Sequence, residues 1–250
     1  MGFFDFFSSS KGAKSGGGKR MSERELARLT RLVGDKLSQN YDRQEAISQL
    51  SALADAEGAR ALLKRFNFTM EPSITDVEEK EAAVEGIVGA GEAALEPLRA
   101  YCSNAASLSW PIRIFKRILS EEQLIDELLS LLDQFDTEYV RDAEPKIDLI
   151  KYLEDHPHPE VREAVEPFLQ DVNEAVRFHA AGTILAMAQP SGVRALVAAL
   201  EEEESLRVKN RIASGVAQHA WEVPEELHAL AREHLPVGYS LADGKVIGKA

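Results

Sequence analysis

Cysteine, aromatic residues and long apolar runs are all scarce in this sequence of 250 residues. The single cysteine, Cys102, excludes an internal disulfide framework and a multi-cysteine zinc site. Aromatic residues make up 7% of the chain, and no apolar run approaches the length of about 18 residues that a membrane span needs. We therefore expect a soluble protein of a reducing compartment, most simply the cytoplasm.

Positive charge is in the minority, with 29 Lys and Arg residues against 42 Asp and Glu residues and a net charge of −13. Such a chain repels phosphate backbones, so we expect no nucleic-acid partner. The acidic clusters at Glu78, Glu79, Glu81 and Glu85, at 121–127 and at 201–204 are typical of solvated helix faces.

Motifs that carry chemistry are also missing. The chain has no Gly-rich phosphate loop, no His-Glu-x-x-His and no Gly-x-Ser-x-Gly. Gly86, Gly89 and Gly91 are expected at a helix end and turn rather than in a nucleotide cradle. His156-Pro-His158 offers two imidazoles to a metal but has no third ligand nearby in sequence, so we interpret it as an inter-helix loop. We expect no catalytic residue, cofactor or metal, and a buried Cys102.

The first twenty residues differ in composition from the rest of the chain. Phe3, Phe4, Phe6 and Phe7 precede a Ser/Gly/Lys stretch at 8–20, which is typical of a flexible linker and carries neither a secretory nor a myristoylation signal. The segment has a net charge of +3, which leaves about −16 on the remaining residues. It could be an inert tail, a peptide that docks on a partner, or a weak contact with an anionic membrane.

An abundance of Ala, Leu, Glu and Arg indicates an all-α protein. Ser22 and Glu25 form a capping-box pattern that predicts a helix to about Leu37. Beyond it, six helix pairs are predicted with spacings of 34, 32, 32, 36 and 30 residues, and a period in this range is typical of a solenoid. Their first helices are expected to start near Asp42, Asp76, Leu108, Val140, Val176 and Leu206.

The segment from Asp171 to Leu185 has an acidic opening, then Val-Arg, small residues and Leu, and it resembles the first helix of a HEAT repeat. Parts of this pattern recur at 155–164, 140–141 and 206–209, and Gly91 to Leu98 looks like the start of a second HEAT helix. The resemblance covers roughly 42–236 and implies a right-handed α-solenoid of about six HEAT-like hairpins. It also implies that the recurring Arg141, Arg177 and Asp171 are structural.

The residue pattern within these helices predicts how they pack. Small side chains are expected where helices approach closely, and larger apolar side chains are expected beside them. The small residues are Ala82, Ala180, Ala181 and Ala213, and the larger ones are Val84, Ile87, Ile184, Leu185, Ile212 and Val216, with Ala143, Ile147, Ile150 and Leu153 forming a further face.

The chain therefore divides into a Phe-rich tail and linker at 1–20, an N-terminal cap helix within 21–41, a HEAT-like solenoid at 42–236 and a C-terminal β-hairpin at 237–250. The hairpin is predicted by Asp243-Gly244 between two short β-prone runs, and it should pack on the last helix pair.

The candidate binding residues are Trp110, Arg113 and Arg117, which share one helix face and belong to residue types common in binding hot spots. Trp110 could instead simply pack between adjacent helices. Arg60, Lys64, Arg65, Arg99, Arg113 and Arg117 are expected to form a local basic strip.

These features predict a non-catalytic scaffold or adaptor that binds a partner protein along the solenoid, with the Phe-rich tail as a second contact. Two enzyme classes with HEAT-like folds are the alternatives: bilin lyases, and DNA glycosylases that use Trp and basic residues. A metal-dependent hydroxylase is excluded because its His-Glu dipeptides are missing. A peripheral membrane organiser, held through residues 1–20, is the third possibility.

Overall fold

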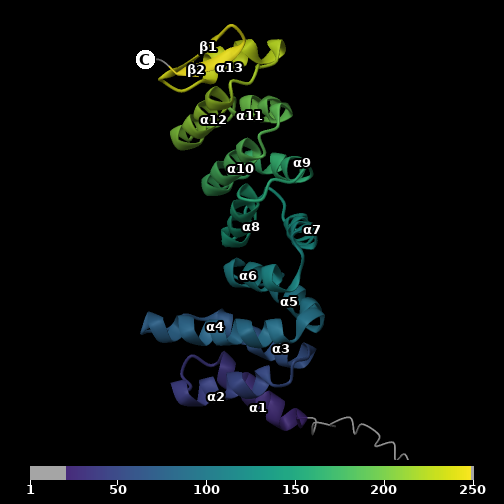
Figure 1. Ribbon diagram of the computed structural model, residues 1–250. Coiled ribbons are helices and arrows are strands. Elements are labelled where there is room, and N and C mark those ends of the chain that lie inside the picture. The colour runs from purple at the N-terminus through teal and green to yellow at the C-terminus, as the bar shows by residue number, and fades with distance from the viewer. Residues whose placement is uncertain (1–20, 249–250) are drawn as a thin grey trace, which may run out of the picture.

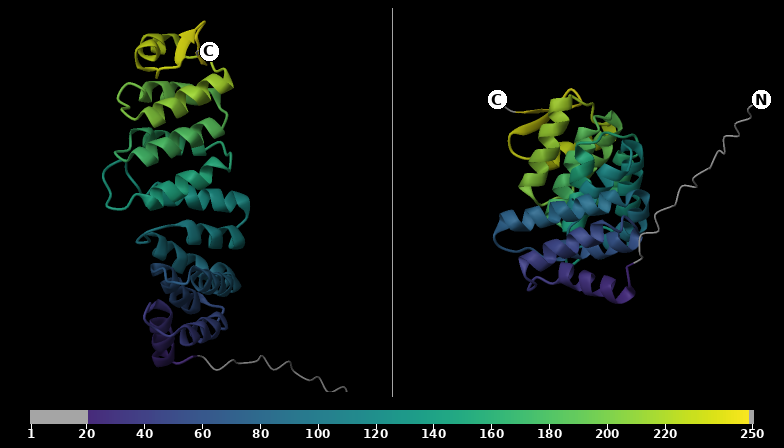
Figure 2. Two further views of the ribbon diagram at one scale, coloured as in Figure 1. Left: turned by 90° about the vertical axis from the view of Figure 1, so that its left-hand side faces the viewer. Right: turned by 60° about the horizontal axis from the view of Figure 1, so that its bottom comes forward.

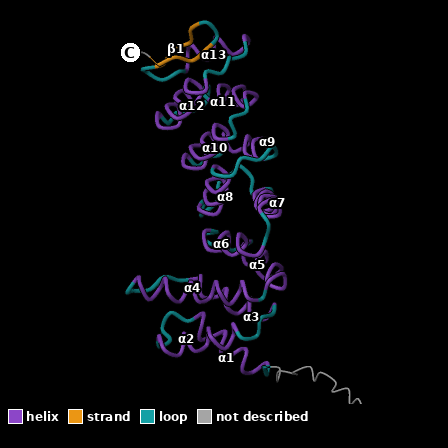
Figure 3. The backbone as a smooth tube through the Cα atoms, viewed as in Figure 1, coloured by secondary structure: helices purple, strands orange, loops and turns teal. Residues whose placement is uncertain are grey.

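The chain is mostly α-helical, with a two-stranded antiparallel sheet near its C-terminus (Figure 3). The computed structural model describes residues 21–248, which contain thirteen α-helices. Within this range, no helix has both the length and the apolar character needed to cross a membrane.

The first helix, α1 (Glu23–Gly34), begins where the sequence predicts. The Ser22 hydroxyl accepts a hydrogen bond from the Glu25 N–H at 3.3 Å, and Leu29 and Val33 are buried. The helix ends three residues before the predicted Leu37, because the Asp35 side chain accepts the Leu37 N–H at 2.8 Å and closes a turn there.

After α1, the helices form two columns in an elongated stack, with α1 at one end and the strands at the other (Figures 1 and 2). One column holds α2 (Asn40–Ser51), α4 (Ser73–Gly89), α6 (Ser109–Ile118), α8 (Glu144–Glu154), α10 (Glu174–Ala186) and α12 (Leu206–His219). The other holds α3 (Ala56–Leu62), α5 (Leu95–Cys102), α7 (Glu121–Leu132), α9 (Val161–Val165) and α11 (Val193–Ala199), and α13 (His228–His234) lies beside the strands.

Adjacent helices of the first column run parallel. Arg43 of α2 pairs with Glu79 of α4, and further along both helices a Cβ on Gly86 would lie 2.1 Å from the Ser51 hydroxyl. Helices α4 and α6 also run parallel, because Arg113 pairs with Glu81 and Arg117, one turn later, pairs with Glu85. The N-terminal ends of neighbouring helices in this column therefore share one edge of the molecule.

The predicted helix starts at Asp42, Asp76, Val176 and Leu206 fall in the first turns of α2, α4, α10 and α12, and Leu108 is the residue that precedes α6. The start at Val140 is wrong, because 135–143 is irregular and α8 begins at Glu144. Asp136 and Asp142 each accept a backbone N–H two residues later, and these Asx turns compete with helix formation.

A continuous apolar core fills the space between the columns. Ala180, Ala181 and Ala213 are fully buried, as expected, together with the larger side chains of α4, α10 and α12. The prediction for Ala82 is wrong: Ala82 is exposed and Ala83 is buried, so this position of α4 is shifted by one residue. In α8, Ile150 and Leu153 are buried, and Ile147 and the preceding Ala143 are partly buried against the core, as predicted; Leu149 is buried as well.

The C-terminal hairpin forms as predicted. Strands β1 (Tyr239–Ala242) and β2 (Lys245–Gly248) pair antiparallel, and Asp243 and Gly244 make the turn with φ of 49° and 75°. Positive φ at both positions is the geometry of a type I′ turn. The buried Val246 and a hydrogen bond from the Val223 N–H to the Gly244 carbonyl, at 2.8 Å, fix the hairpin against the last helices.

Candidate functional site

The three predicted anchor residues share one face of α6, and that face is in contact with α4. Trp110 is half-buried and stacks on Phe66 with ring centroids 5.6 Å apart, and the Arg113 guanidinium lies 4.6 Å from the Trp110 centroid. Arg113 also pairs with Glu81 at 2.8 Å. Trp110 thus packs between adjacent helices, and Arg113 combines cation–π and ionic contacts there.

Arg117 extends this contact by pairing with Glu85 of α4 through two hydrogen bonds. The hydrogen bonds from Arg117 lower the pKa of the Glu85 carboxyl below its usual value. The side chains of Arg113 and Arg117 remain 53% and 44% exposed, so both can still be reached from solvent. The other four predicted contacts, Phe3, Phe4, Phe6 and Phe7, lie outside the described residues.

The expected basic strip is not a free positive surface. Arg60 pairs with Glu96 of α5 at 2.8 Å, Arg99 pairs with Glu127 of α7, and Arg65 is completely buried. Each of these cations is neutralised by a carboxylate of a neighbouring helix, a partner that the linear sequence does not indicate.

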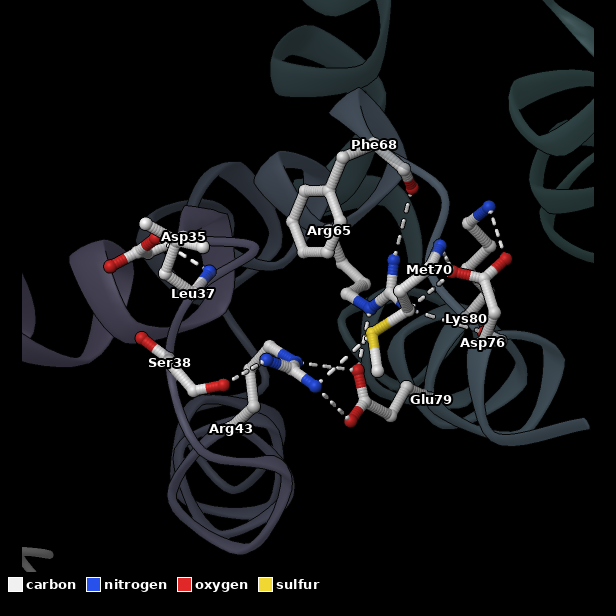
Figure 4. Close-up of polar contacts among 10 residues, drawn as sticks. All are labelled: Asp35, Leu37, Ser38, Arg43, Arg65, Phe68, Met70, Asp76, Glu79 and Lys80. Carbon is white, nitrogen blue, oxygen red and sulfur yellow. Dashed lines mark hydrogen bonds and ion pairs between the residues drawn. The ribbon is translucent and has the colours of Figure 1, made fainter. Parts of the chain in front are cut away.

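Arg65 belongs to a buried charge cluster between α2 and α4 that sequence reasoning missed (Figure 4). Glu79 accepts hydrogen bonds from Arg43 at 2.8 and 3.0 Å and from Arg65 at 2.7 Å. Asp76 accepts from Arg65 and Lys80, both at 2.7 Å. The prediction that Glu79 lies on a solvated face is therefore wrong, because it is 1% exposed and balances two guanidinium groups.

The electrostatics of Asp76 follow from this arrangement. Burial by itself would raise the pKa of its carboxyl, but hydrogen bonds from Lys80 and Arg65 outweigh burial and lower it. The Asp76 carboxylate thus stays charged and paired, which suits a structural role better than proton transfer.

Arg43 also ties together two loops, because it donates to the Ser38 carbonyl at 2.6 Å and contacts the Met70 sulfur at 3.1 Å (Figure 4). The same arrangement recurs twice further along the stack. Lys146 near the start of α8 donates to the carbonyls of Asp136 and Glu138 and to the Asp171 carboxylate.

In the next layer, Arg177 of α10 donates to the Asp171 carbonyl at 2.9 Å and to Glu203 at 2.7 and 2.9 Å. In all three places, a cation in the first turn of a helix joins the preceding loop to a carboxylate of the next layer. Arg177 and Asp171 take part as expected. Arg141, which was also expected to be structural, is exposed instead. Lys146 makes the contacts that were expected of Arg141, because α8 starts later than predicted.

An open groove of about 610 Å³ lies between α5 and α7 in the second column. Glu96 and Glu127 line it but are paired with Arg60 and Arg99, so its acidic character rests on Asp126, which makes no ion pair with any described residue. Apolar contacts are available from Leu95, Ala100, Leu119 and Leu131. An acidic groove with apolar walls suits a segment that carries both basic and apolar side chains.

Cys102 lies close to this groove but is buried. Burial raises the pKa of its thiol to about 12, and the charge of Glu127 adds to the rise. The thiol is therefore protonated at neutral pH and is a poor nucleophile.

His156 and His179 make packing contacts. His156 stacks on Tyr152 at 4.2 Å between ring centroids, and its Nδ1 lies 2.8 Å from the Tyr152 carbonyl oxygen. His179 faces Glu154 at 3.9 Å, and its pKa is lowered chiefly by burial. In the part of the chain that the structure describes, no three His, Cys, Asp or Glu side chains are grouped to hold a metal ion.

Comparison of the chain with models of known protein families and with curated proteins finds no match. The function is therefore argued from the geometry above.

Proposed function

We propose that the chain is a right-handed α-solenoid of about six HEAT-like helical hairpins. The two columns of helices support this. So does the recurring contact in which Arg43, Lys146 or Arg177, in the first turn of a helix, joins the preceding loop to a carboxylate of the next layer. In a solenoid each unit contacts only its neighbours, so contacts across layers should recur at the repeat length. The ion pairs Arg113–Glu81, Arg207–Glu174 and Arg194–Glu226 join residues about one such period apart.

We further propose that the protein is a non-catalytic scaffold or adaptor that binds a partner protein in the α5–α7 groove. The observation that carries this proposal is the groove itself, in the column that contains α5 and α7. The groove is open and combines the carboxylate of Asp126 with apolar walls. A partner segment would place a basic side chain near Asp126 and apolar side chains against Leu119 and Leu131. The Phe-rich segment at 1–20 would be a second, tethered contact, and two linked contacts raise avidity through effective concentration.

The two enzyme alternatives find less support. A bilin lyase that used Cys102 as its nucleophile would need a reachable thiolate, and this thiol is buried with a raised pKa. A DNA glycosylase would need a positive groove, and five of the six cations of the expected strip, all except Lys64, are paired with carboxylates of described residues. The proposal includes no cofactor or metal. A membrane contact would have to come from residues 1–20. A cytoplasmic location is the simplest setting for such an adaptor.

The proposal is tested by affinity capture from native lysate with three forms of the full chain. Asp126→Arg with Ser130→Arg reverses the charge of the groove and fills it, since both side chains are exposed groove residues. Glu201→Arg with Glu204→Arg is the matched control, because it makes two exposed residues basic far from the groove. We expect a specific protein that the wild type and the control retain and the groove variant loses.

A third variant, Trp110→Ala with Arg113→Glu, separates the two candidate surfaces. If this variant alone loses the captured protein, the binding surface is the α6 face rather than the α5–α7 groove. If all forms capture the same proteins as an unrelated acidic protein, the scaffold proposal is wrong. Salt-dependent retention on duplex DNA would instead favour the glycosylase alternative.

A further inference from the structure

A cluster of exposed apolar side chains lies at the end of the stack nearest the N-terminus. Leu37 is 88% exposed, Tyr41 77%, Ile74 71% and Val77 47%. They belong to the α1–α2 turn and to the first turns of α2 and α4, and we call them the N-edge patch. Large apolar side chains gathered on a surface mark a contact site more often than isolated ones do.

The backbone holds these side chains outward. The Asp35 carboxylate accepts the Leu37 N–H, and the resulting turn presents Leu37 to solvent. Since α2 and α4 run parallel, their first turns lie at the same edge of the molecule. Arg43 holds the loops before the two helices side by side through Ser38 and Met70, so the patch is a fixed feature of this end of the stack (Figure 4).

The surroundings of the N-edge patch are acidic. The exposed charged residues in the segments 35–45 and 71–78 carry five negative charges against the single positive charge of Lys36. The acidic residues are Asp35, Asp42, Glu45, Glu71 and Glu78. An occupant of this surface should therefore combine apolar side chains with positive charge.

The chain itself contains such a segment. Residues 1–20 carry four phenylalanines followed by Lys11, Lys14, Lys19 and Arg20, against the single acid Asp5. We propose that, in the free protein, Phe3, Phe4, Phe6 and Phe7 cover the N-edge patch of the same chain, with the basic residues facing its acidic surroundings.

The distances allow this contact. Thirteen residues separate Phe7 from Met21 and can span up to about 44 Å. The twelve residues of α1 rise about 18 Å and lead from Ser22 to the turn that contains Leu37. A tether of this length keeps the phenylalanines at a high effective concentration around the patch, so a contact that is weak between separate molecules is populated within one chain.

The test is paramagnetic relaxation on the full-length protein. A nitroxide on Ser10→Cys reports where the Phe-rich segment lies, because the buried Cys102 does not react with the label. Wild-type chain treated with the same reagent verifies this. We expect amide signals of 35–41 and 71–78 to be lost, and those around Tyr139 and Val172 to be retained.

Two variants of the labelled chain decide whether the contact is specific. Replacing Phe3, Phe4, Phe6 and Phe7 with Ser should restore the lost signals, because it removes the apolar side chains of the tail. The double variant Leu37→Glu with Ile74→Glu should restore them too, because it removes apolar side chains of the patch. Loss that persists without the phenylalanines, or no loss at the patch, overturns the proposal. Loss that appears only when labelled chain is mixed with isotope-enriched, unlabelled chain also overturns it, because the occupant is then a second copy.

Discussion

Glu79 shows how a single buried carboxylate can hold two layers of the molecule together. It is the shared acceptor for Arg43 of α2 and for Arg65, which lies between α3 and α4. Paired charges of this kind contribute little net stability compared with an apolar core, but removing one partner leaves the others buried and uncompensated. The cluster therefore adds little to the stability of the protein, but the protein is strongly destabilised when one member of the cluster is removed.

We predict that Glu79→Gln lowers the free energy of unfolding by about 3–5 kcal/mol, because two guanidinium groups lose their shared anion. Its exposed neighbour Glu78 makes a matched control, and Glu78→Gln should change stability by less than about 0.5 kcal/mol. Urea unfolding followed by circular dichroism measures both. Equal stability of the two variants would show that the cluster is not coupled to folding.

Glu203 gives a prediction for pH. Burial raises the pKa of its carboxyl, but hydrogen bonds from Arg177 and from the Ser205 N–H outweigh burial and lower it. The stability from this carboxylate is thus fully present above the unfolded-state pKa of about 4.3, and it is lost as pH falls through the lower folded-state pKa.

We expect Glu203→Gln to be less stable than wild type by about 1.5–3 kcal/mol at pH 7. The difference between the two proteins should shrink as the pH falls below the unfolded-state pKa and through the lowered folded-state pKa of Glu203, since protonation then removes from wild type the same charge that the mutation removes. Urea midpoints measured at several pH values check this. The exposed Glu201→Gln is the matched control and should change stability at pH 7 by less than about 0.5 kcal/mol. A stability difference for Glu203→Gln that stays constant with pH would contradict the assignment.

At this scale, the sequence indicated some roles and missed others. Arg177 and Asp171 were predicted to be structural from a recurring pattern, and their contacts bear this out. Glu79 could not be separated from Glu78 or Glu81, because all three belong to one acidic run and only the rotation of α4 decides which one is buried. No local signal could have revealed that Arg43, 36 positions away, is its partner.

The packing of α2 on α4 depends on the absence of a side chain at Gly86. A Cβ there would lie 2.1 Å from the Ser51 Oγ and 2.7 Å from a Leu62 methyl carbon. Glycine is unfavourable in a helix interior by about 1 kcal/mol relative to alanine, so this close approach explains its use.

We predict that Gly86→Ala destabilises the protein despite the better helix propensity, because overpacking costs about 1–3 kcal/mol. Gly89→Ala in the same helix should stabilise it by up to about 1 kcal/mol, since a Cβ there meets no atom within 4 Å. Urea unfolding of both variants gives the comparison. A stabilising Gly86→Ala would mean that α2 and α4 can separate without cost.

The helices themselves were largely predictable, because their apolar spacing and caps are local properties. The predicted helix ends were wrong where an Asp side chain accepts a backbone N–H and so favours a turn over a helix. Asp35 ended α1 early, and Asp136 and Asp142 delayed α8. The C-terminal hairpin was predictable because Asp243-Gly244 is a local signal of high specificity.

The whole molecule is long in one direction, and its two ends lie far apart (Figure 2). A compact chain of 250 residues would have a radius of gyration of about 18 Å. We predict a clearly larger value from small-angle X-ray scattering, because the layers add along a single axis. A value near that of a compact globule would show that the stack closes on itself in solution.

The sequence by itself determined the helical class, the spacing of the helices and the C-terminal hairpin, because these follow from periodicity and from residues close together in the chain. Only the tertiary structure decided that five of the six basic residues expected to form a strip are paired, that Glu79 is buried, and that α5 and α7 leave a groove. Each of these depends on which side chains meet across layers, and that depends on helix rotation and spacing rather than on any local pattern.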